Sequence, residues 1–138
     1  MIRRILLGYD GSTSAEHAYD FAVELARRFG AELHVLAVVR PPEFGDEVET
    51  AAAIEHSQRH YGHVLAALKP RLARDVPGSQ ATLAVGHPAE QLVRHAEQHG
   101  IDHIVVGHRG RTTFERWLIG SVARQTIAYA HCAVTVVR

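Results

Sequence analysis

Short, strongly apolar runs alternate along the whole chain with longer stretches in which apolar residues recur at helical spacing. The apolar runs predict five strands, over residues 5–9, 33–39, 81–85, 101–106 and 134–137. The stretches between them predict four helices, over residues 15–29, 48–72, 89–99 and 122–130. The strand runs are too apolar to alternate with polar residues, which is typical of a parallel sheet covered by helices on both faces. The sequence therefore predicts an α/β fold in a single domain over residues 1–138.

Cap and turn residues mark some of the expected helix ends without deciding them. Thr13, with Glu16 three residues later, fits a capping box, although Ser12 or Ser14 could equally be the N-cap of the first helix. Pro70 is expected to kink or end the second helix. At these two points the sequence leaves the helix boundary open.

A glycine-rich segment follows the fourth predicted strand. Gly107 ends the apolar run of residues 104–106, Gly110 follows three residues later, and Gly120 and Ser121 open the next helical pattern. This Gly-x2-Gly-x9-Gly-Ser spacing places glycines, which let a ligand approach the backbone closely, between a buried strand and a helix start. A helix N-terminus capped by serine offers free N–H groups and positive dipole character to an anion. The segment therefore predicts a phosphate-binding site.

The first predicted strand ends in a second group of polar and small residues, Asp10, Gly11 and Ser12. In an open parallel sheet, ligands bind beyond the carboxyl ends of the strands, where the strand order switches. If the first and fourth strands are neighbours, this group faces the glycine-rich segment across one crevice. Arg109 and the backbone amides would hold phosphates there. Asp10 could hold a ribose hydroxyl, an adenine edge or Mg²⁺, or could merely cap the first helix.

Composition argues against several classes of protein. Lys plus Arg and Asp plus Glu number 15 each, so the formal net charge is zero, which argues against nucleic acid as the main partner. No apolar run approaches the length of a membrane span, and the lone cysteine, Cys132, allows no internal disulfide. We expect a cytoplasmic protein that binds neither nucleic acid nor membrane.

Taken together, these residues resemble the universal stress protein family in its nucleotide-binding form, over nearly the whole chain. The first strand with its acidic turn (residues 5–12), the Gly-x2-Gly-x9-Gly-Ser segment (104–121) and the last helix and strand (121–138) fit the family pattern. The chain departs from that pattern at Ala133, where a proline is common, and at Thr112-Thr113, where the segment is often glycine.

The resemblance implies a five-stranded parallel sheet in the order 3-2-1-4-5, which makes the first and fourth strands neighbours. It also implies a regulatory or stress-response protein that binds ATP, with Mg²⁺. Adenine would lie near Asp10 and the end of the second strand, at Ala37 or Val38. Six residues of the glycine-rich segment and the helix after it would bind the ribose and phosphates: Gly107, Arg109, Gly110, Gly120, Ser121 and Val122.

The last predicted strand, Val134 to Val137, is a short β-branched run that would form one edge of this sheet. An exposed apolar edge invites pairing with another chain. We therefore expect a homodimer formed through this strand, to which the family resemblance also points.

Two groups among the 11 histidines have helical spacing. His56, His60 and His63 would share one face of the second helix, and His95 and His99 one face of the third. Such groups can chelate zinc or nickel. The His-Glu-x-x-His form of metalloproteases is absent from the sequence, and we favour a solvated histidine-rich face.

The sequence favours nucleotide binding over rapid hydrolysis. Lys69 is the only lysine, and the sequence has no Gly-x4-Gly-Lys, no Gly-x-Ser-x-Gly and no kinase signature. His108, inside the glycine-rich segment, could contact a phosphate or make binding pH-dependent, although exposure at the surface is the default expectation. Only Asp10 or His108 could serve as a base. A slow ATPase or autophosphorylating enzyme, and a nucleotide-free dimer or metal-handling protein, are the alternatives.

Overall fold

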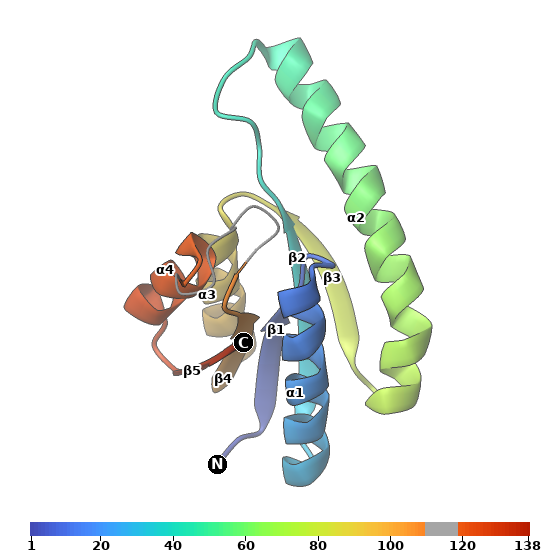
Figure 1. The fold of residues 1–138 in the computed structure, drawn as a ribbon, viewed down its shortest axis with the longest axis vertical. Helices are drawn as coiled ribbons and strands as arrows, with labels where there is room; N and C mark the ends of the chain where they lie inside the picture. The colour runs from blue at the N-terminus through green and yellow to red at the C-terminus, as the bar shows by residue number, and fades with distance from the viewer. Residues whose placement is uncertain (110–118) are drawn as a thin grey trace.

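The computed structural model describes residues 1–109 and 119–138, in which strands and helices alternate. The elements are β1 (Arg4–Gly8), α1 (Thr13–Phe29), β2 (Glu32–Val39), α2 (Glu47–Asp75), β3 (Gln80–Val85), α3 (Pro88–His99), β4 (His103–Gly107), α4 (Ser121–Tyr129) and β5 (Ala133–Val137). All neighbouring strands are parallel, and the sheet has the order β3-β2-β1-β4-β5 (Figure 1). The predicted α/β fold and the strand order implied by the resemblance are confirmed.

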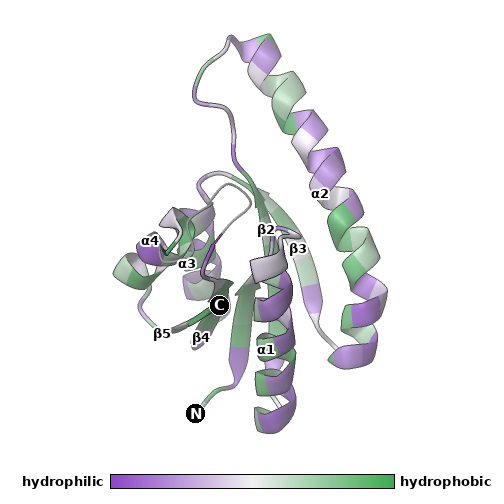
Figure 2. Cartoon of the chain, viewed as in Figure 1, coloured by the Kyte–Doolittle hydropathy of each residue, from purple (hydrophilic) through white to green (hydrophobic). Residues whose placement is uncertain are grey.

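Helices cover both faces of the sheet, α1 and α2 on one face and α3 and α4 on the other. Ile5 and Leu7 of β1 pack in the core with α1 and α2, whereas Leu6 packs in the core with α3 and α4. All three side chains are fully buried, because both faces of β1 are covered. Figure 2 shows that the central strands are mainly hydrophobic and that α2 carries both hydrophobic and hydrophilic residues along its length.

The structure decides the helix boundaries that the sequence left open. Ser12 is the N-cap of α1, and its Oγ accepts a hydrogen bond from the backbone N–H of Ala15 at 3.1 Å. Pro70 lies inside α2, which continues to Asp75, so the alternative in which Pro70 ends the helix is wrong. Leu72, buried against the sheet, anchors the turn beyond the proline.

The N-terminal half of α2 extends past the carboxyl ends of the strands (Figure 1). The buried residues of α2 are Leu65, Leu68 and Leu72, all in its C-terminal half. The N-terminal half can therefore lie beside the loops that follow the strands. None of the helices in the described ranges combines the length and the apolar character that a membrane crossing needs.

Candidate functional site

A cavity of about 310 Å³ opens at the carboxyl ends of the strands. Its wall is built from the ends of β1, β2 and β4, the start of α4, and parts of α1, α2 and α3. Seven of the residues expected at a nucleotide site line it: Asp10, Val38, Gly107, Arg109, Gly120, Ser121 and Val122. The cavity therefore lies where the crevice between the first and fourth strands was predicted.

The sheet topology explains why this crevice exists. β1 lies between β2 and β4, and Leu7 pairs with Val35 on one side and with Val105 on the other. The loop after β1 leads to α1 on one face of the sheet, and the loop after β4 leads to α4 on the opposite face. Because α1 and α4 lie on opposite faces of the sheet, a space is left between their first turns at the strand ends.

The turn after β1 positions Asp10. Its Oδ1 accepts a hydrogen bond from the backbone N–H of Ser12 at 2.9 Å. Gly11 between them has a φ of 79°, a left-handed conformation that glycine adopts without strain. Asp10 thus both shapes the turn and lines the cavity, whereas Ser12 caps α1. Gly11 and Ser12 form the turn behind the wall and are not part of its lining.

β2 contributes Val38 to the cavity and Ala37 to the core. Side chains alternate between the two faces of a strand. Ala37 is fully buried in the core with α1 and α2, while Val38 and Leu36 line the cavity. Of the two candidates for the adenine contact, only Val38 faces the site.

Gly107 allows α1 to pack directly against the end of β4. A Cβ atom on Gly107 would lie 2.8 Å from the carbonyl carbon, the carbonyl oxygen and the Cβ of Ser14. Any side chain here would therefore push the first turn of α1 away from β4. The position is glycine because of this close approach, and its backbone lines the cavity.

His108 is buried, so the default expectation of surface exposure is wrong. It is 8% exposed, its backbone N–H donates to the carbonyl oxygen of Val137 at 2.8 Å, and its Nδ1 lies 3.5 Å from Ser14 Oγ. Burial, with the positive charge of Arg109 nearby, lowers the pKa of His108. The ring packs toward α1 and is not part of the cavity lining, so the structure does not bring it together with the other candidate residues.

α4 begins at the cavity wall. Its N-cap is Gly120, with φ −61° and ψ 158°, so Ser121 is the first helical residue and not the cap that the sequence suggested. The backbone N–H of Gly120 donates to the carbonyl of His108 at 2.6 Å, which joins the start of α4 to the end of β4. Among residues 1–109 and 119–138 no side chain caps the first turn, so its N–H groups can meet an anion. Gly110 lies outside the described residues, and its predicted role stays a prediction.

Tyr9, another wall residue, is tied to α1 and α2 through a polar network. Its hydroxyl donates to the Glu16 carboxylate, and Glu16 Oε2 lies 2.6 Å from Nη2 of Arg71. The Arg71 guanidinium lies 4.1 Å from the centroid of the Tyr19 ring, and the Tyr19 hydroxyl donates to Asp75 Oδ2 at 2.6 Å. Burial and the Glu16 carboxylate raise the pKa of Tyr9, while burial and Asp75 raise the pKa of Tyr19 to about 12. Both phenols are therefore hydrogen-bond donors at neutral pH.

Several wall residues were not found from the sequence. α2 supplies Ser57 and Tyr61, Arg40 follows β2, and α3 supplies Pro88 and Leu92. In the sequence, Tyr61 is one of several apolar residues at helical spacing and is not distinguished from core residues. Ser57 carried no signal, because only the packing of α2 brings it to the strand ends. Arg40 could have been found from its position just after a predicted strand.

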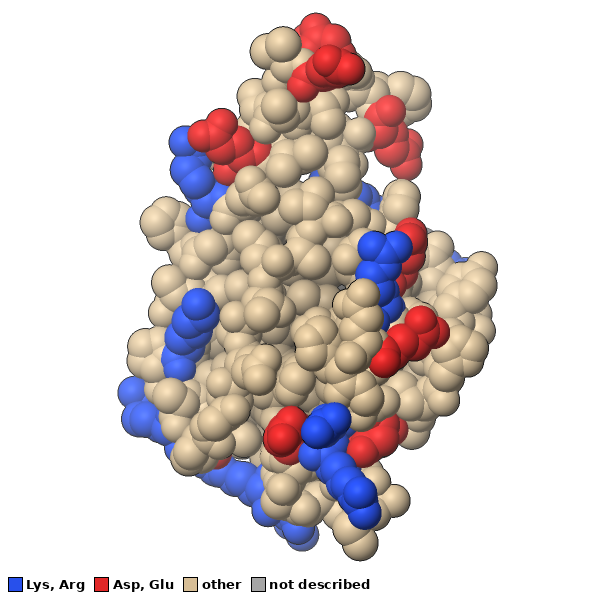
Figure 3. Space-filling view, turned by 180° about the vertical axis from the view of Figure 1, so that it is seen from behind, with Lys and Arg blue, Asp and Glu red and all other residues tan. Residues whose placement is uncertain are grey.

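The charges of the wall suit an anionic ligand. Arg40 and Arg109 carry positive charge into the lining, and Asp10 carries negative charge. The positive end of the α4 dipole adds to the two arginines. The charge elsewhere is mixed, and on the face in Figure 3 the acidic side chains include a group at the tip where α2 begins. The wall can therefore hold phosphates beside Arg109 and α4, and a hydroxyl group or a metal ion beside Asp10.

The histidines with helical spacing do not form metal sites in the described parts of the chain. No group of three or more His, Cys, Asp or Glu residues among residues 1–109 and 119–138 is placed to hold a metal ion. His56, His60 and His63 are exposed on α2, and the His60 ring lies edge-on to a tyrosine. His95 and His99 instead stack on each other, with ring centroids 4.0 Å apart.

Comparisons with known proteins agree with this arrangement. A model of the universal stress protein family matches residues 1–138. A universal stress protein from Thermus aquaticus is 32% identical over 139 residues, which cover 100% of both chains. Universal stress protein UspA from Lactobacillus plantarum has a TM-score of 0.89 and 28% identity, over 99% of this chain and 97% of that one.

Two other solved structures share the fold and contain an adenine nucleotide. One is a universal stress protein in complex with cAMP, with a TM-score of 0.74 and 23% identity over 99% of this chain and 97% of that one. The other, from Archaeoglobus fulgidus, is in complex with dAMP, with a TM-score of 0.67 and 21% identity over 100% of this chain and 98% of that one. Because the family model spans the whole chain and the fold agrees, this chain belongs to the universal stress protein family.

Proposed function

We propose that this chain binds ATP, with Mg²⁺, in the cavity at the strand ends and acts as a regulatory, stress-response protein of the cytoplasm. One observation carries the proposal: Asp10 and the N-terminal start of α4 line the same cavity, together with Arg109. A carboxylate, a guanidinium and a helix N-terminus in one wall suit a ligand that has both hydroxyl groups and phosphates.

Under this proposal, each part of the nucleotide has a matching part of the wall. Val38 and Leu36 offer apolar surface to the adenine ring, and Asp10 accepts from a ribose hydroxyl or the adenine edge. The phosphates lie against Arg109, the backbone of Gly107 and the first turn of α4. Mg²⁺ takes phosphate oxygens, waters and few protein carboxylates, so Asp10 fits as its protein neighbour. The relatives in complex with cAMP and dAMP support an adenine nucleotide as the ligand class.

Binding without rapid turnover is part of the proposal. In the described part of the wall, Asp10 is the one carboxylate, and its Oδ1 already accepts the Ser12 N–H. His108 has a buried ring that contacts α1, away from the lining. A base poised to activate water is therefore not found among the described wall residues, and we expect phosphate release to be slow.

The decisive experiment measures nucleotide in the purified protein. The chain, purified gently and then denatured, should release an adenine nucleotide that chromatography identifies. Protein stripped of nucleotide should melt at a higher temperature in millimolar ATP and Mg²⁺, because ligand at ~100 Kd adds about 2.7 kcal/mol. Absence of both the nucleotide and the thermal shift would refute the proposal.

Matched variants locate the binding site. Asp10→Asn keeps an oxygen for the Ser12 N–H but removes the charge, and Arg109→Gln removes the proposed phosphate contact. Each should weaken ATP binding about 10- to 150-fold, since a charge-assisted hydrogen bond contributes about 1.5–3 kcal/mol. Arg59→Gln, at an exposed position on α2, is the control and should bind ATP as the wild type does.

Pairing of two copies through β5 is a separate part of the proposal. β5 pairs with β4 on one side, and its residues 134–137 are partly exposed. Ile127 and Tyr129 on the neighbouring α4 add exposed apolar surface, at 50% and 67% exposure. Light scattering should give twice the 15.2 kDa mass of the chain. A monomer at micromolar concentration would contradict the dimer but not nucleotide binding.

A further inference from the structure

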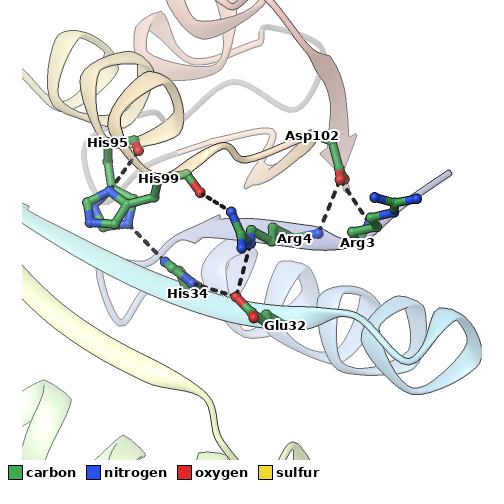
Figure 4. A network of polar contacts seen from close by, with 7 residues as sticks. All are labelled: Arg3, Arg4, Glu32, His34, His95, His99 and Asp102. Carbon is green, nitrogen blue, oxygen red and sulfur yellow. Dashed lines mark hydrogen bonds and ion pairs between the residues drawn. The ribbon is translucent and has the colours of Figure 1, made fainter.

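Three imidazoles meet at the end of the sheet opposite the cavity. His34 comes from the start of β2, and His95 and His99 come from the last turns of α3 (Figure 4). His34 Nδ1 lies 3.2 Å from His95 Nε2, and the His95 and His99 rings stack with centroids 4.0 Å apart. His34 is 5% exposed. We call these three residues the histidine cluster.

The contacts of the cluster favour one arrangement of its protons. His34 Nε2 lies 3.6 Å from Oε2 of Glu32, a carboxylate that can only accept, so a neutral His34 with its proton on Nε2 suits this contact. His34 Nδ1 is then an acceptor, and the contact at 3.2 Å requires His95 to donate from Nε2. One further proton on the pair leaves an N–H···N bond in place, because the ring that stays neutral can accept through its other tautomer, whereas protonation of both rings sets two N–H groups against each other. The bond between β2 and α3 therefore exists only while at least one of His34 and His95 is neutral.

The charges around the cluster do not favour extra protons. Glu32, from β2, is shared with Arg4 of β1, whose Nε lies 3.3 Å from Glu32 Oε2. Arg4 also donates from Nη1 to the carbonyl of His99 at 3.2 Å, so a cation already lies beside the cluster. Asp102, just before β4, accepts from the backbone N–H of Arg4 at 3.2 Å and faces the far side of this network.

The other charged groups of α3 have partners of their own. Arg94 pairs with Glu90 at 3.4 Å, and His131, after α4, lies 3.1 Å from Glu97. β3, the other neighbour of β2, places the uncharged Gln80 opposite His34. Protonation of the cluster would therefore add positive charge beside Arg4 with only the shared Glu32 to offset it.

α3 joins the histidine cluster to the cavity. Its C-terminal turns carry His95 and His99, and its N-terminal half supplies Pro88 and Leu92 to the cavity wall. Leu92 lies directly against the strand end, because a Cβ on Gly8 would be 3.1 Å from its Cδ1. A movement of α3 away from β2 would thus alter the cavity wall.

We propose that the histidine cluster is an acid-sensitive latch: the hydrogen bond between His34 and His95 holds the C-terminal turns of α3 on β2, and protonation of both rings releases them. Burial lowers the pKa of His34, and burial together with His99 lowers the pKa of His95 to about 4. Both residues are neutral at pH 7 while the latch is closed, and an opened latch regains the ordinary pKa and takes up protons. Opening is therefore favoured as the pH falls below 6.5. If the cavity binds ATP as proposed, acidification would weaken that binding through α3.

Hydrogen exchange of the nucleotide-free protein tests the latch. Between pH 7 and pH 5, after correction for intrinsic exchange rates, amides of residues 92–99 should lose protection on the order of 10-fold relative to amides of α1. His95→Gln retains an N–H donor for His34 but does not titrate. In this variant the loss of amide protection in residues 92–99, relative to α1, should therefore fall to a few-fold. His56→Gln on α2 and His131→Gln beside Glu97 are controls and should behave as the wild type does.

Three results would overturn the latch. The first is equal loss of protection in α1 and α3, which would mean that acid acts on the whole fold. The second is the same loss in His95→Gln as in the wild type. The third, measured by NMR titration of the wild type and so independent of how the variant folds, is a midpoint for His95 at or above 6.5. None of these measurements involves nucleotide, so their failure is distinguishable from failure of the proposed function.

Discussion

Replacing Gly107 by alanine adds one methyl group where the end of β4 meets the first turn of α1. The new carbon would lie 2.8 Å from three atoms of Ser14, of which two belong to the backbone. Backbone atoms cannot swing aside as the end of a flexible side chain can. The contact is relieved only if α1 and β4 separate by about 0.6 Å, the difference between 2.8 Å and the 3.4 Å at which ordinary contact begins.

The expected loss of stability follows from this overlap. Added volume in a well-packed interior destabilises by about 1–3 kcal/mol. For a domain of this size, each kcal/mol lowers the melting temperature by roughly 3–5 °C, so Gly107→Ala should melt roughly 3–15 °C below the wild type. The first turn of α1 begins three residues after Asp10, so the same shift should also disturb the cavity wall.

Denaturant unfolding measures the change in the free energy of unfolding of Gly107→Ala, with Gly62→Ala as the control. Gly62 lies inside α2, and a Cβ there meets nothing within 4 Å. Gly62→Ala should therefore stabilise the protein by about 0.5–1 kcal/mol, because alanine is the better helix residue. If Gly107→Ala unfolds within 0.5 kcal/mol of the wild type, a margin of roughly one experimental error, the close approach of α1 to β4 is not a constraint on this position.

Three further predictions concern the rest of the fold. Arg71→Met removes the ion pair with Glu16 and the contact with the Tyr19 ring, and should lower the free energy of unfolding by about 1–2 kcal/mol after allowance for the partly exposed pair. The control Arg59→Met, at an exposed position, should change the free energy of unfolding by less than ~0.5 kcal/mol. Equal values for the two variants would contradict the network. Gly30→Ala places a side chain at a φ of 62° with nothing within 4 Å, so denaturant unfolding should show a loss of about 1 kcal/mol from backbone strain alone, and no loss would contradict this. The pH dependence of stability follows from His95, whose pKa in the fold is lowered to about 4. Between pH 6.5 and pH 4 the unfolded chain binds more protons than the folded one, so the free energy of unfolding should fall as the pH falls through this window. Urea titrations that show a flat or rising free energy of unfolding as the pH falls would refute the lowered pKa of His95.

Much of the fold and part of the candidate site could be predicted from local patterns. Apolar runs marked each strand to within two residues of its observed start, since burial on both faces of a parallel sheet leaves no polar alternation. Strand ends located the site, because loops that follow parallel strands meet at one edge of the sheet. In this way Asp10, Gly107 and Arg109 were predicted together and line one cavity.

Other parts of the site depend on contacts between elements that no local pattern encodes. The sequence left Ala37 and Val38 as equal candidates, and the pairing of β2 in the sheet decided that Val38 faces the cavity. His108 was expected at the surface, but the packing of α1 and β5 around the end of β4 buries it. Ser57 reaches the cavity only because α2 extends past the strand ends.

By itself, the sequence determined which segments are strands, which are helices, and where glycine and acidic residues follow a strand. These features depend on periodicity and on hydrogen bonds within a few residues, both of which are local properties of the chain. Tertiary structure alone decided which faces meet: Gly107 against Ser14, and His34 against His95, whose residue numbers differ by 61. Such contacts arise when helices from distant parts of the chain pack on one sheet, and their geometry depends on all the packed side chains together.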